Sequence, residues 1–191
     1  MGILKMANFQ TLIFSSFPPL TVIMEHNGED LTYDDALIEK DTRKLATTVT
    51  FLLNITQVGK YACLFASSLQ FVDIPEGVTS INDSSFFQCR GLKVIKFPRS
   101  LRKIGFRAFR DCTGLERVDL GETGVVEMEK WAFANCSEIK SMTIPESLQA
   151  EGIGNRCFLR CSKLNPSNMD VTDNAVVIEY LRSQQTEPET K

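Results

Sequence analysis

The sequence predicts an α/β solenoid, in which each coil contributes one short strand to a parallel sheet and one helical turn. The main observation is a motif, Ala108–Leu115, that recurs along the chain. The other copies are Ser85–Leu92, Ala132–Ile139 and Cys157–Leu164. Their phenylalanines lie 23, 24 and 25 residues apart, at Phe86, Phe109, Phe133 and Phe158. Self-similarity with a period of roughly 20–50 residues is typical of solenoids, because each repeat buries its apolar face against its neighbours.

The second observation is a short alternating pattern after each motif. One coil reads Ile95-x-Phe97 and then Pro98. The equivalent patterns elsewhere are Val72-x-Ile74, Val118-x-Leu120 and Met142-x-Ile144. Alternation of apolar and other residues predicts a half-buried strand. Because proline donates no ladder hydrogen bond, we expect the strands to end at Pro75, Pro98 and Pro145.

The motif itself supplies the third part of the coil. Its Phe and Cys are three residues apart, as Phe109 and Cys112 are, and this spacing suits a single helical turn that directs the ring inward. Four aligned phenylalanines should then form a continuous buried spine. Aromatic side chains contribute large apolar areas, so this spine should dominate the core.

The combined pattern, L-x-x-V-x-I-P-x-x-V-x-x-I-x-x-x-A-F-x-x-C, resembles the BspA-type leucine-rich repeat family over roughly Val49–Leu164. We count about three and a half strong repeats, preceded by one and a half weaker ones. The resemblance implies a right-handed leucine-rich-repeat stack used for binding, of a kind found in bacterial surface proteins and microbial eukaryotes. Two extra residues between Leu148 and Ile153 depart from the pattern and should bulge one turn.

The repeats divide the chain into three parts. Residues 1–44 show no period and should form an irregular N-terminal segment or cap, since terminal repeats need an atypical cover. Residues 45–166 should form the solenoid. Residues 167–191 should form a capping helix, with Val177, Tyr180 and Leu181 on one side, followed by a disordered tail.

Bulk composition narrows the class of protein. A net charge of −3 over 191 residues gives no reason to expect general nucleic-acid or membrane binding. No apolar run reaches the length of about 18 residues that predicts a membrane span. The stretch Phe9–Met24 is apolar enough for a signal peptide, but Pro18-Pro19 interrupts it and no small-x-small cleavage site follows. We therefore favour a cytoplasmic location over secretion.

The six cysteines fit a buried role. Five of them stand in apolar columns of the repeat, and Cys157 replaces its alanine. Because free cysteine behaves as a small buried hydrophobe, we predict reduced core thiols rather than disulfides. Cys157-x-x-x-Cys161 is only half a zinc site, and the sole histidine, His26, lies far away in the sequence. We predict no metal and no other cofactor.

The sequence carries no enzyme motif. It has no phosphate-binding glycine-rich loop, no G-x-S-x-G elbow, and no histidine beside a Ser or Cys nucleophile. We therefore predict no catalytic residues and a non-enzymatic protein–protein interaction module. A secreted or cell-surface adhesin-like repeat protein is the first alternative. An enzyme with an unrecognised site in the N-terminal segment is the second and less favoured one.

The outward face of the strands is the first candidate binding surface. Since Val72 and Ile74 should point inward, their strand neighbours must point outward. The outward residues in three successive coils are Phe71 and Asp73, Val94 and Lys96, Arg117 and Asp119. An aromatic centre with a polar rim suits a partner protein. Two alternatives remain open: the N-terminal segment covers Phe71 and Val94, or the alternating charges only fix coil register and solubility.

A second candidate is Trp131, in the column two residues before each motif phenylalanine. Its neighbours in that column are Arg107 and Arg156. Arginine above and below an indole ring suits cation–π contact. Trp131 therefore either fastens coils together or serves as an aromatic anchor for a partner.

Overall fold

The computed structural model describes residues 2–5, 11–14, 21–24, 44–51 and 55–164, and these form a solenoid of stacked coils. Each complete coil has three sides. Two of them are strands of parallel sheets and the third consists of consecutive turns. The predicted solenoid with a parallel sheet is therefore confirmed. No helix in the described residues is long and apolar enough to cross a bilayer.

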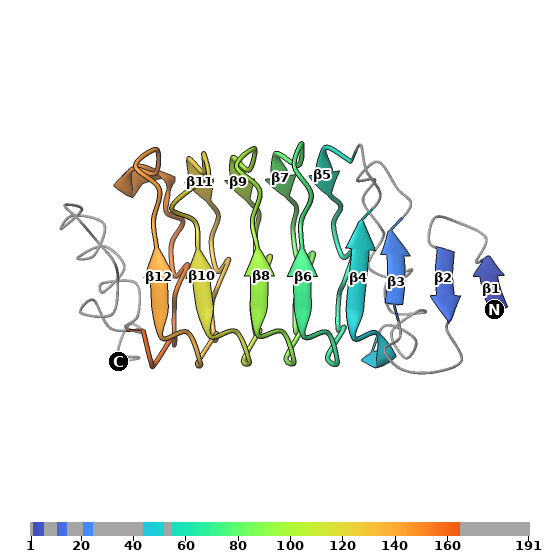
Figure 1. The fold of residues 1–191 in the computed structure, drawn as a ribbon. Coiled ribbons are helices and arrows are strands. Elements are labelled where there is room, and N and C mark those ends of the chain that lie inside the picture. Colours follow the sequence, from blue (N-terminus) through green and yellow to red (C-terminus); the bar gives the residue numbers. More distant parts are fainter. Residues whose placement is uncertain (1, 6–10, 15–20, 25–43, 52–54, 165–191) are drawn as a thin grey trace.

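The first side is a row of parallel strands that we call the front sheet, seen face-on in Figure 1. Its strands are β4 (Thr48–Phe51), β6 (Phe71–Asp73), β8 (Val94–Lys96), β10 (Arg117–Asp119) and β12 (Ser141–Thr143). Equivalent residues pair without slippage, as Phe71 does with Val94. Between β8 and β10 the Glu116 N–H donates to the Lys93 carbonyl at 3.3 Å. Each strand is short because the chain turns a corner directly after it.

The second side is a further parallel sheet. The sequence predicts no strand there, only recurring apolar positions. Its strands are β5 (Gln57–Val58), β7 (Ser80–Ile81), β9 (Lys103–Ile104) and β11 (Glu127–Met128). An isolated parallel bridge between Met128 and Ile153 continues it into the last described coil. There the chain forms a 3-10 helix, η1 (Ala150–Gly152), so the two-residue insertion bulges the turn and leaves Ile153 in its column.

The third side, which we call the turn side, differs from the predicted helical turn. In each coil, the residues two before and two after the motif phenylalanine have positive φ. They are Tyr61, Phe65, Ser84, Gln88, Arg107, Asp111, Trp131, Asn135, Arg156 and Arg160. (The first coil has Cys63 in the phenylalanine position.) Because these left-handed residues are interspersed with residues of negative φ, every second N–H group points along the solenoid axis. The chain therefore bonds to the next coil instead of closing a helix.

One coil shows the pattern clearly. The N–H groups of Ser84, Phe86 and Gln88 donate to carbonyls of the next coil at 2.8–2.9 Å. The intervening N–H groups, such as that of Phe87, donate three residues back within their own coil. All backbone donors of the segment are thus satisfied, as burial requires. The described part of the chain accordingly has minimal helical content.

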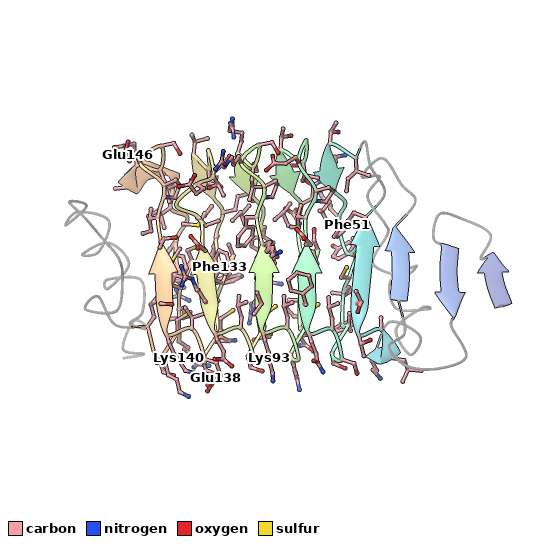
Figure 2. All side chains as sticks on the ribbon, viewed as in Figure 1. Phe51, Lys93, Phe133, Glu138, Lys140 and Glu146 are labelled. Carbon is pink, nitrogen blue, oxygen red and sulfur yellow. The ribbon has the colours of Figure 1, made fainter. Side chains whose placement is uncertain are left out.

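The core contains the predicted phenylalanine spine. Phe86, Phe109, Phe133 and Phe158 are fully buried. Their rings stack with centroid distances of 5.1 Å, 5.1 Å and 5.3 Å and interplanar angles of 3–8°. Phe133, a member of this spine, is labelled in Figure 2. Phe97 meets Phe109 edge to face, with centroids 5.9 Å apart, and thereby joins the front sheet to the spine.

The cysteine column lies beside the spine. The thiols of Cys112, Cys136 and Cys161 each donate to the carbonyl of a motif phenylalanine in the previous coil, at 3.1–3.2 Å. A cysteine in this column therefore fills a small apolar space and also satisfies a buried carbonyl. The predicted burial of these residues is confirmed.

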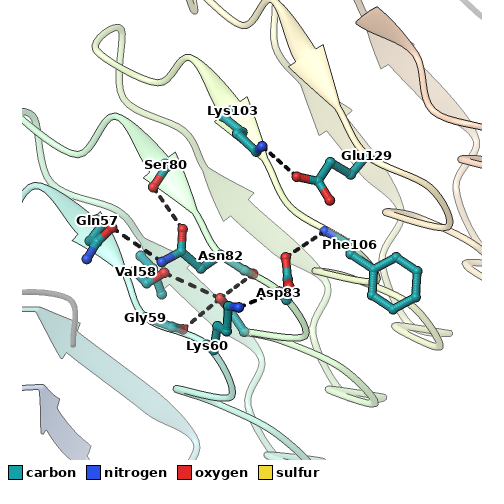
Figure 3. A network of polar contacts seen from close by, with 11 residues as sticks. Gln57, Val58, Gly59, Lys60, Ser80, Asn82, Asp83, Lys103, Phe106 and Glu129 are labelled. Atoms are coloured by element: carbon teal, nitrogen blue, oxygen red, sulfur yellow. Dashed lines mark hydrogen bonds and ion pairs between the residues drawn. The ribbon is translucent and has the colours of Figure 1, made fainter. Parts of the chain in front are cut away.

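Polar contacts between coils gather at one corner, as Figure 3 shows. The Asp83 carboxylate accepts the Phe106 N–H at 3.1 Å and lies 3.4 Å from the Lys60 ammonium. The buried Ser85 hydroxyl donates its one hydrogen between the carbonyls of Asn82 and Gly59, which lie 2.6 Å and 2.8 Å from its oxygen. These contacts are structural, because they satisfy backbone groups where the chain enters the turn side.

The N-terminal segment contains three strands that extend the front sheet, although the sequence predicts an irregular segment there. They are β1 (Gly2–Lys5), β2 (Thr11–Phe14) and β3 (Thr21–Met24). β1, β2 and β3 pair antiparallel, and β3 joins β4 in parallel. The predicted capping helix and tail at 167–191 lie outside the described residues. The boundaries at 44 and 166 stay predictions.

The spine makes a direct prediction about stability. Phe109→Ala should destabilise the protein by about 3–5 kcal/mol, because it leaves a cavity between two stacked rings. Phe87→Ala removes the same side chain from a half-buried position on the turn side, where the ring meets Phe65, and should cost only about 1 kcal/mol. Urea unfolding of both variants tests this. Equal losses would contradict the assigned register.

The turn side makes a second prediction. Gln88 has a φ of 59°, and left-handed backbone costs a residue with a Cβ about 1–2 kcal/mol. Gln88→Val should therefore destabilise, since β-branched residues avoid this conformation, while Gln88→Gly should match or exceed the wild-type stability. Lys93→Val, at an exposed position outside the positive-φ set, is the control. If the two valine variants unfolded at the same urea concentration, the left-handed turn would be wrong.

Candidate partner-binding surfaces

The outward face of the front sheet has the side-chain directions that the sequence predicts. In β6, β8 and β10 the central residue is buried and its two neighbours are exposed. Phe71 is 37% exposed and Val94 is 49% exposed. They are register partners on adjacent strands, so their side chains lie about one strand spacing apart. The structure therefore brings the two apolar candidates together on one face.

The three described strands of the N-terminal segment extend the front sheet and do not lie over this pair. β3 pairs with the edge of β4 and continues the sheet sideways, as Figure 1 shows, so the sheet widens beyond β4. Phe71 and Val94 stay exposed.

Charged residues surround the apolar pair. The Lys96 ammonium lies 3.6 Å from the Asp73 carboxylate and 5.5 Å from the centre of the Phe71 ring. On β10, Arg117 pairs with Asp119 at 2.9 Å. A hydrogen bond from the Thr143 hydroxyl, and then Arg117, lowers the pKa of Asp119. These contacts are solvated and contribute little stability, so their main effect is to hold the charges in place.

The two rims of the front sheet carry ion pairs between successive coils. At the lower rim in Figure 2, Lys140 pairs with Glu116 at 3.0 Å and Lys163 pairs with Glu138 at 2.6 Å. Lys140 lowers the pKa of Glu116. At the other rim, Arg99 pairs with Glu122 at 3.2 Å. These pairs join equivalent positions of neighbouring coils.

Trp131 lies on the turn side rather than with the strand residues, so the candidate residues form two separate surfaces. Arg107, Arg110 and Lys130 place their cationic groups 4.6, 5.2 and 4.4 Å from the centre of the indole ring. Phe106 lies 5.7 Å from it and contacts Arg107 as well. The predicted contact with Arg107 is confirmed. The contacts with Arg110 and Lys130 were not predicted, because these residues stand in other columns.

The described residues offer few groups for catalysis or metal binding. No cluster of three or more His, Cys, Asp or Glu side chains in this part of the chain is arranged to hold a metal ion. His26 lies outside the described residues. The cysteines are buried, and burial raises the pKa of the Cys112 and Cys161 thiols well above the usual range. A thiol of raised pKa is a poor nucleophile, because the thiolate is the reactive form.

The thiols give a prediction that separates buried cysteines from reactive ones. Native protein treated with an alkylating reagent at neutral pH should keep Cys89, Cys112 and Cys136 unmodified, and unfolding should expose them at once. A cysteine introduced at the exposed position Ser67, as Ser67→Cys, is the control and should react rapidly. Intact mass gives the readout. A native mass that reveals disulfides among these three cysteines, or alkylation of them in the native protein, would contradict the prediction.

Comparisons with known proteins agree with the solenoid. A family model for the BspA-type leucine-rich repeat region matches residues 47–180 in 6 copies. A leucine-rich repeat protein of T. pallidum is 25% identical, with a TM-score of 0.55, over 65% of this chain and 68% of that one. None of the curated proteins compared with the chain matches it.

Two further solved structures share the fold at lower identity. A leucine-rich cell surface protein of Faecalibacterium prausnitzii is 17% identical, with a TM-score of 0.58, over 94% of this chain. A leucine-rich repeat protein of Bacteroides ovatus is 22% identical, with a TM-score of 0.55, over 86% of this chain. The chain spans only 41% and 42% of the length of these two proteins.

Proposed function

Since the chain belongs to the BspA-type leucine-rich repeat family, we propose that it is a non-enzymatic scaffold that binds a protein partner through the outward face of its front sheet. The observation that carries this proposal is the exposed pair Phe71 and Val94. Four large hydrophobic residues in the described part of the chain are exposed, and these two are direct register partners. A contiguous apolar site is where a partner gains most from excluding water.

The surroundings of the pair fit a protein interface. Lys96 lies over Phe71 and pairs with Asp73, so the apolar centre has a charged margin. Arg117 and Asp119 continue that margin on the next strand in the row. In protein interfaces an aromatic centre supplies most of the binding energy, and the charges around it select the partner and its orientation. The ordered backbone beneath reduces the entropy that binding costs.

The location of the protein is a separate part of the proposal. We place it in the cytoplasm, because six buried cysteines with no disulfide role suit a reducing compartment. The alternative is a secreted, adhesin-like protein, which the description of the F. prausnitzii relative as a cell surface protein favours. The N-terminus of the protein isolated from its own cells distinguishes the two: an intact Met1 supports the cytoplasm, and cleavage near Met24 supports secretion.

A double variant tests the binding face. Phe71→Ala with Arg117→Ala should weaken binding to the partner by at least about tenfold, since it removes an aromatic anchor and a margin charge. The melting temperature should hardly change, because both side chains are exposed. The partner is first captured with the whole chain as bait, and dissociation constants are then measured with the purified partner.

The matched control is Val126→Ala with Arg90→Ala. It also removes one exposed apolar side chain and one exposed cation, but away from the front sheet. This control should bind like the wild type. Equal affinity of the Phe71→Ala/Arg117→Ala variant and the wild type would exclude the front sheet as the binding face.

A further inference from the structure

The turn side has a charge balance that differs from the rest of the molecule. The segments 60–66, 83–90, 106–112, 130–136 and 155–161 carry seven basic residues and two carboxylates, Asp83 and Asp111. The basic residues are Lys60, Arg90, Arg107, Arg110, Lys130, Arg156 and Arg160. The whole chain has a net charge of −3, so this positive side is a local feature. A concentration of one charge on one side favours ligands of the opposite sign.

The centre of this side is the cation–aromatic cluster of Phe106, Arg107, Arg110, Lys130 and Trp131, which we call the Trp131 cluster. The Arg107 guanidinium makes ring contacts with Phe106 and Trp131, and it forms no hydrogen bond with the described part of the chain. Among the described residues, the only ionic contact of Arg110 is with Asp111, whose carboxylate lies 3.7 Å from the Arg110 Nε. The aromatic rings therefore hold two guanidinium groups in place while most of their N–H donors stay unused.

The cluster contains two buried donors that form no hydrogen bond within the described part of the chain. The Nε atoms of Arg107 and Arg110 are buried without a hydrogen-bond partner. Burial, and then the charge of Arg110, lowers the pKa of Arg107. Two carboxylates lie near the cluster: Asp111 accepts a hydrogen bond from the Asn135 amide at 2.5 Å, and Asp83 accepts the Phe106 N–H at 3.1 Å. Buried donors without partners are rare in folded proteins, and an ion that binds there is one accepted explanation.

We propose that the Trp131 cluster binds carboxylate groups of an acidic peptide segment in a protein partner. Each guanidinium presents several N–H donors in a fixed plane, and carboxylates match that geometry with paired, charge-assisted hydrogen bonds. The cluster is a second binding surface, on a different side from the front-sheet face, and it does not depend on that face. It also accounts for Trp131, which the front-sheet proposal leaves without a role.

An acidic peptide fits the cluster better than a single-stranded nucleic acid. Nucleic acids bind such surfaces mainly by stacking bases on free aromatic faces. Here Arg107, Arg110 and Lys130 already lie within 5.2 Å of the Trp131 ring centre, so the protein's own cations occupy the ring. What the cluster offers a ligand is positive charge and N–H donors, and these recognise carboxylates without any stacking.

Trp131 is the only tryptophan of the chain, so its fluorescence reports directly on the cluster. Hexaglutamate peptide is titrated into the whole protein at low salt, with hexaglutamine as the uncharged control and a short oligothymidylate as the nucleic-acid arm. Hexaglutamate should change the emission saturably, and its affinity should fall as salt rises. Hexaglutamine should leave the emission unchanged.

Two charge-matched variants locate the site. Arg107→Asn with Arg110→Gln should weaken hexaglutamate binding at least about tenfold, since hydrogen bonds to charged groups contribute roughly 1.5–3 kcal/mol each. Asparagine is chosen because it tolerates the left-handed φ of 55° at residue 107. Arg99→Gln with Arg117→Gln removes the same charge from the front-sheet side and should bind hexaglutamate like the wild type. If the first variant unfolds, Arg110→Gln alone replaces it in the experiment. This single variant should also bind hexaglutamate more weakly than the wild type.

Three results would overturn the proposal: no emission change with hexaglutamate, equal weakening by both double variants, or tighter binding of oligothymidylate than of hexaglutamate. The last result would reassign the cluster to nucleic acid. Phe71 is not involved in hexaglutamate binding, so a negative result of this experiment leaves the front-sheet proposal intact. Loss of the front-sheet proposal would likewise leave hexaglutamate binding unaffected.

Discussion

The hydrogen bonds that run from each coil to the next are the interaction on which the rest of the structure depends. On two sides they are ordinary parallel ladders between short strands. On the turn side, alternate N–H groups form them because every coil repeats the same left-handed residues. All three sides keep one register, so equivalent side chains stack in columns. The phenylalanine spine and the cysteine column are direct consequences of that register.

The same stacking determines which ligands the surfaces can bind, because the charge and polarity of a column depend on all the side chains stacked in it. On the front sheet the columns alternate in sign, as Asp73 and Lys96 or Glu116 and Lys140 show, and neighbouring coils neutralise one another. Because the charges cancel, the apolar centre of the front sheet is the feature that a partner would recognise. The turn side also has one such pair, Lys60 with Asp83, but as a whole it carries seven basic residues and two carboxylates. The two surfaces therefore differ in the ligand chemistry they favour.

The sequence could predict the core and the front sheet because both depend on apolar spacing alone. Val72 and Phe86 stand in columns that recur in every strong repeat, and alternation then places Phe71 outward. The turn side could not be predicted in the same way. A three-residue spacing of Phe and Cys fits a helical turn. It fits equally well the observed turns, in which the Cys N–H donates to the carbonyl of the Phe three residues earlier. The residue types give only a partial signal, since Asp111 and Asn135 are types that tolerate positive φ but Arg107 and Trp131 are not.

The Trp131 cluster was partly predictable for the same reason. Arg107 shares a column with Trp131, whereas Arg110 reaches the ring only because left-handed residues turn the segment between the columns. That backbone costs about 1–2 kcal/mol for each left-handed residue with a Cβ, and the hydrogen bonds to the adjoining coil offset the cost. The cluster therefore lies on a segment whose backbone is held by hydrogen bonds to the adjoining coil. Cations held this firmly lose little entropy when a ligand binds, which is what a surface site without a deep pocket requires.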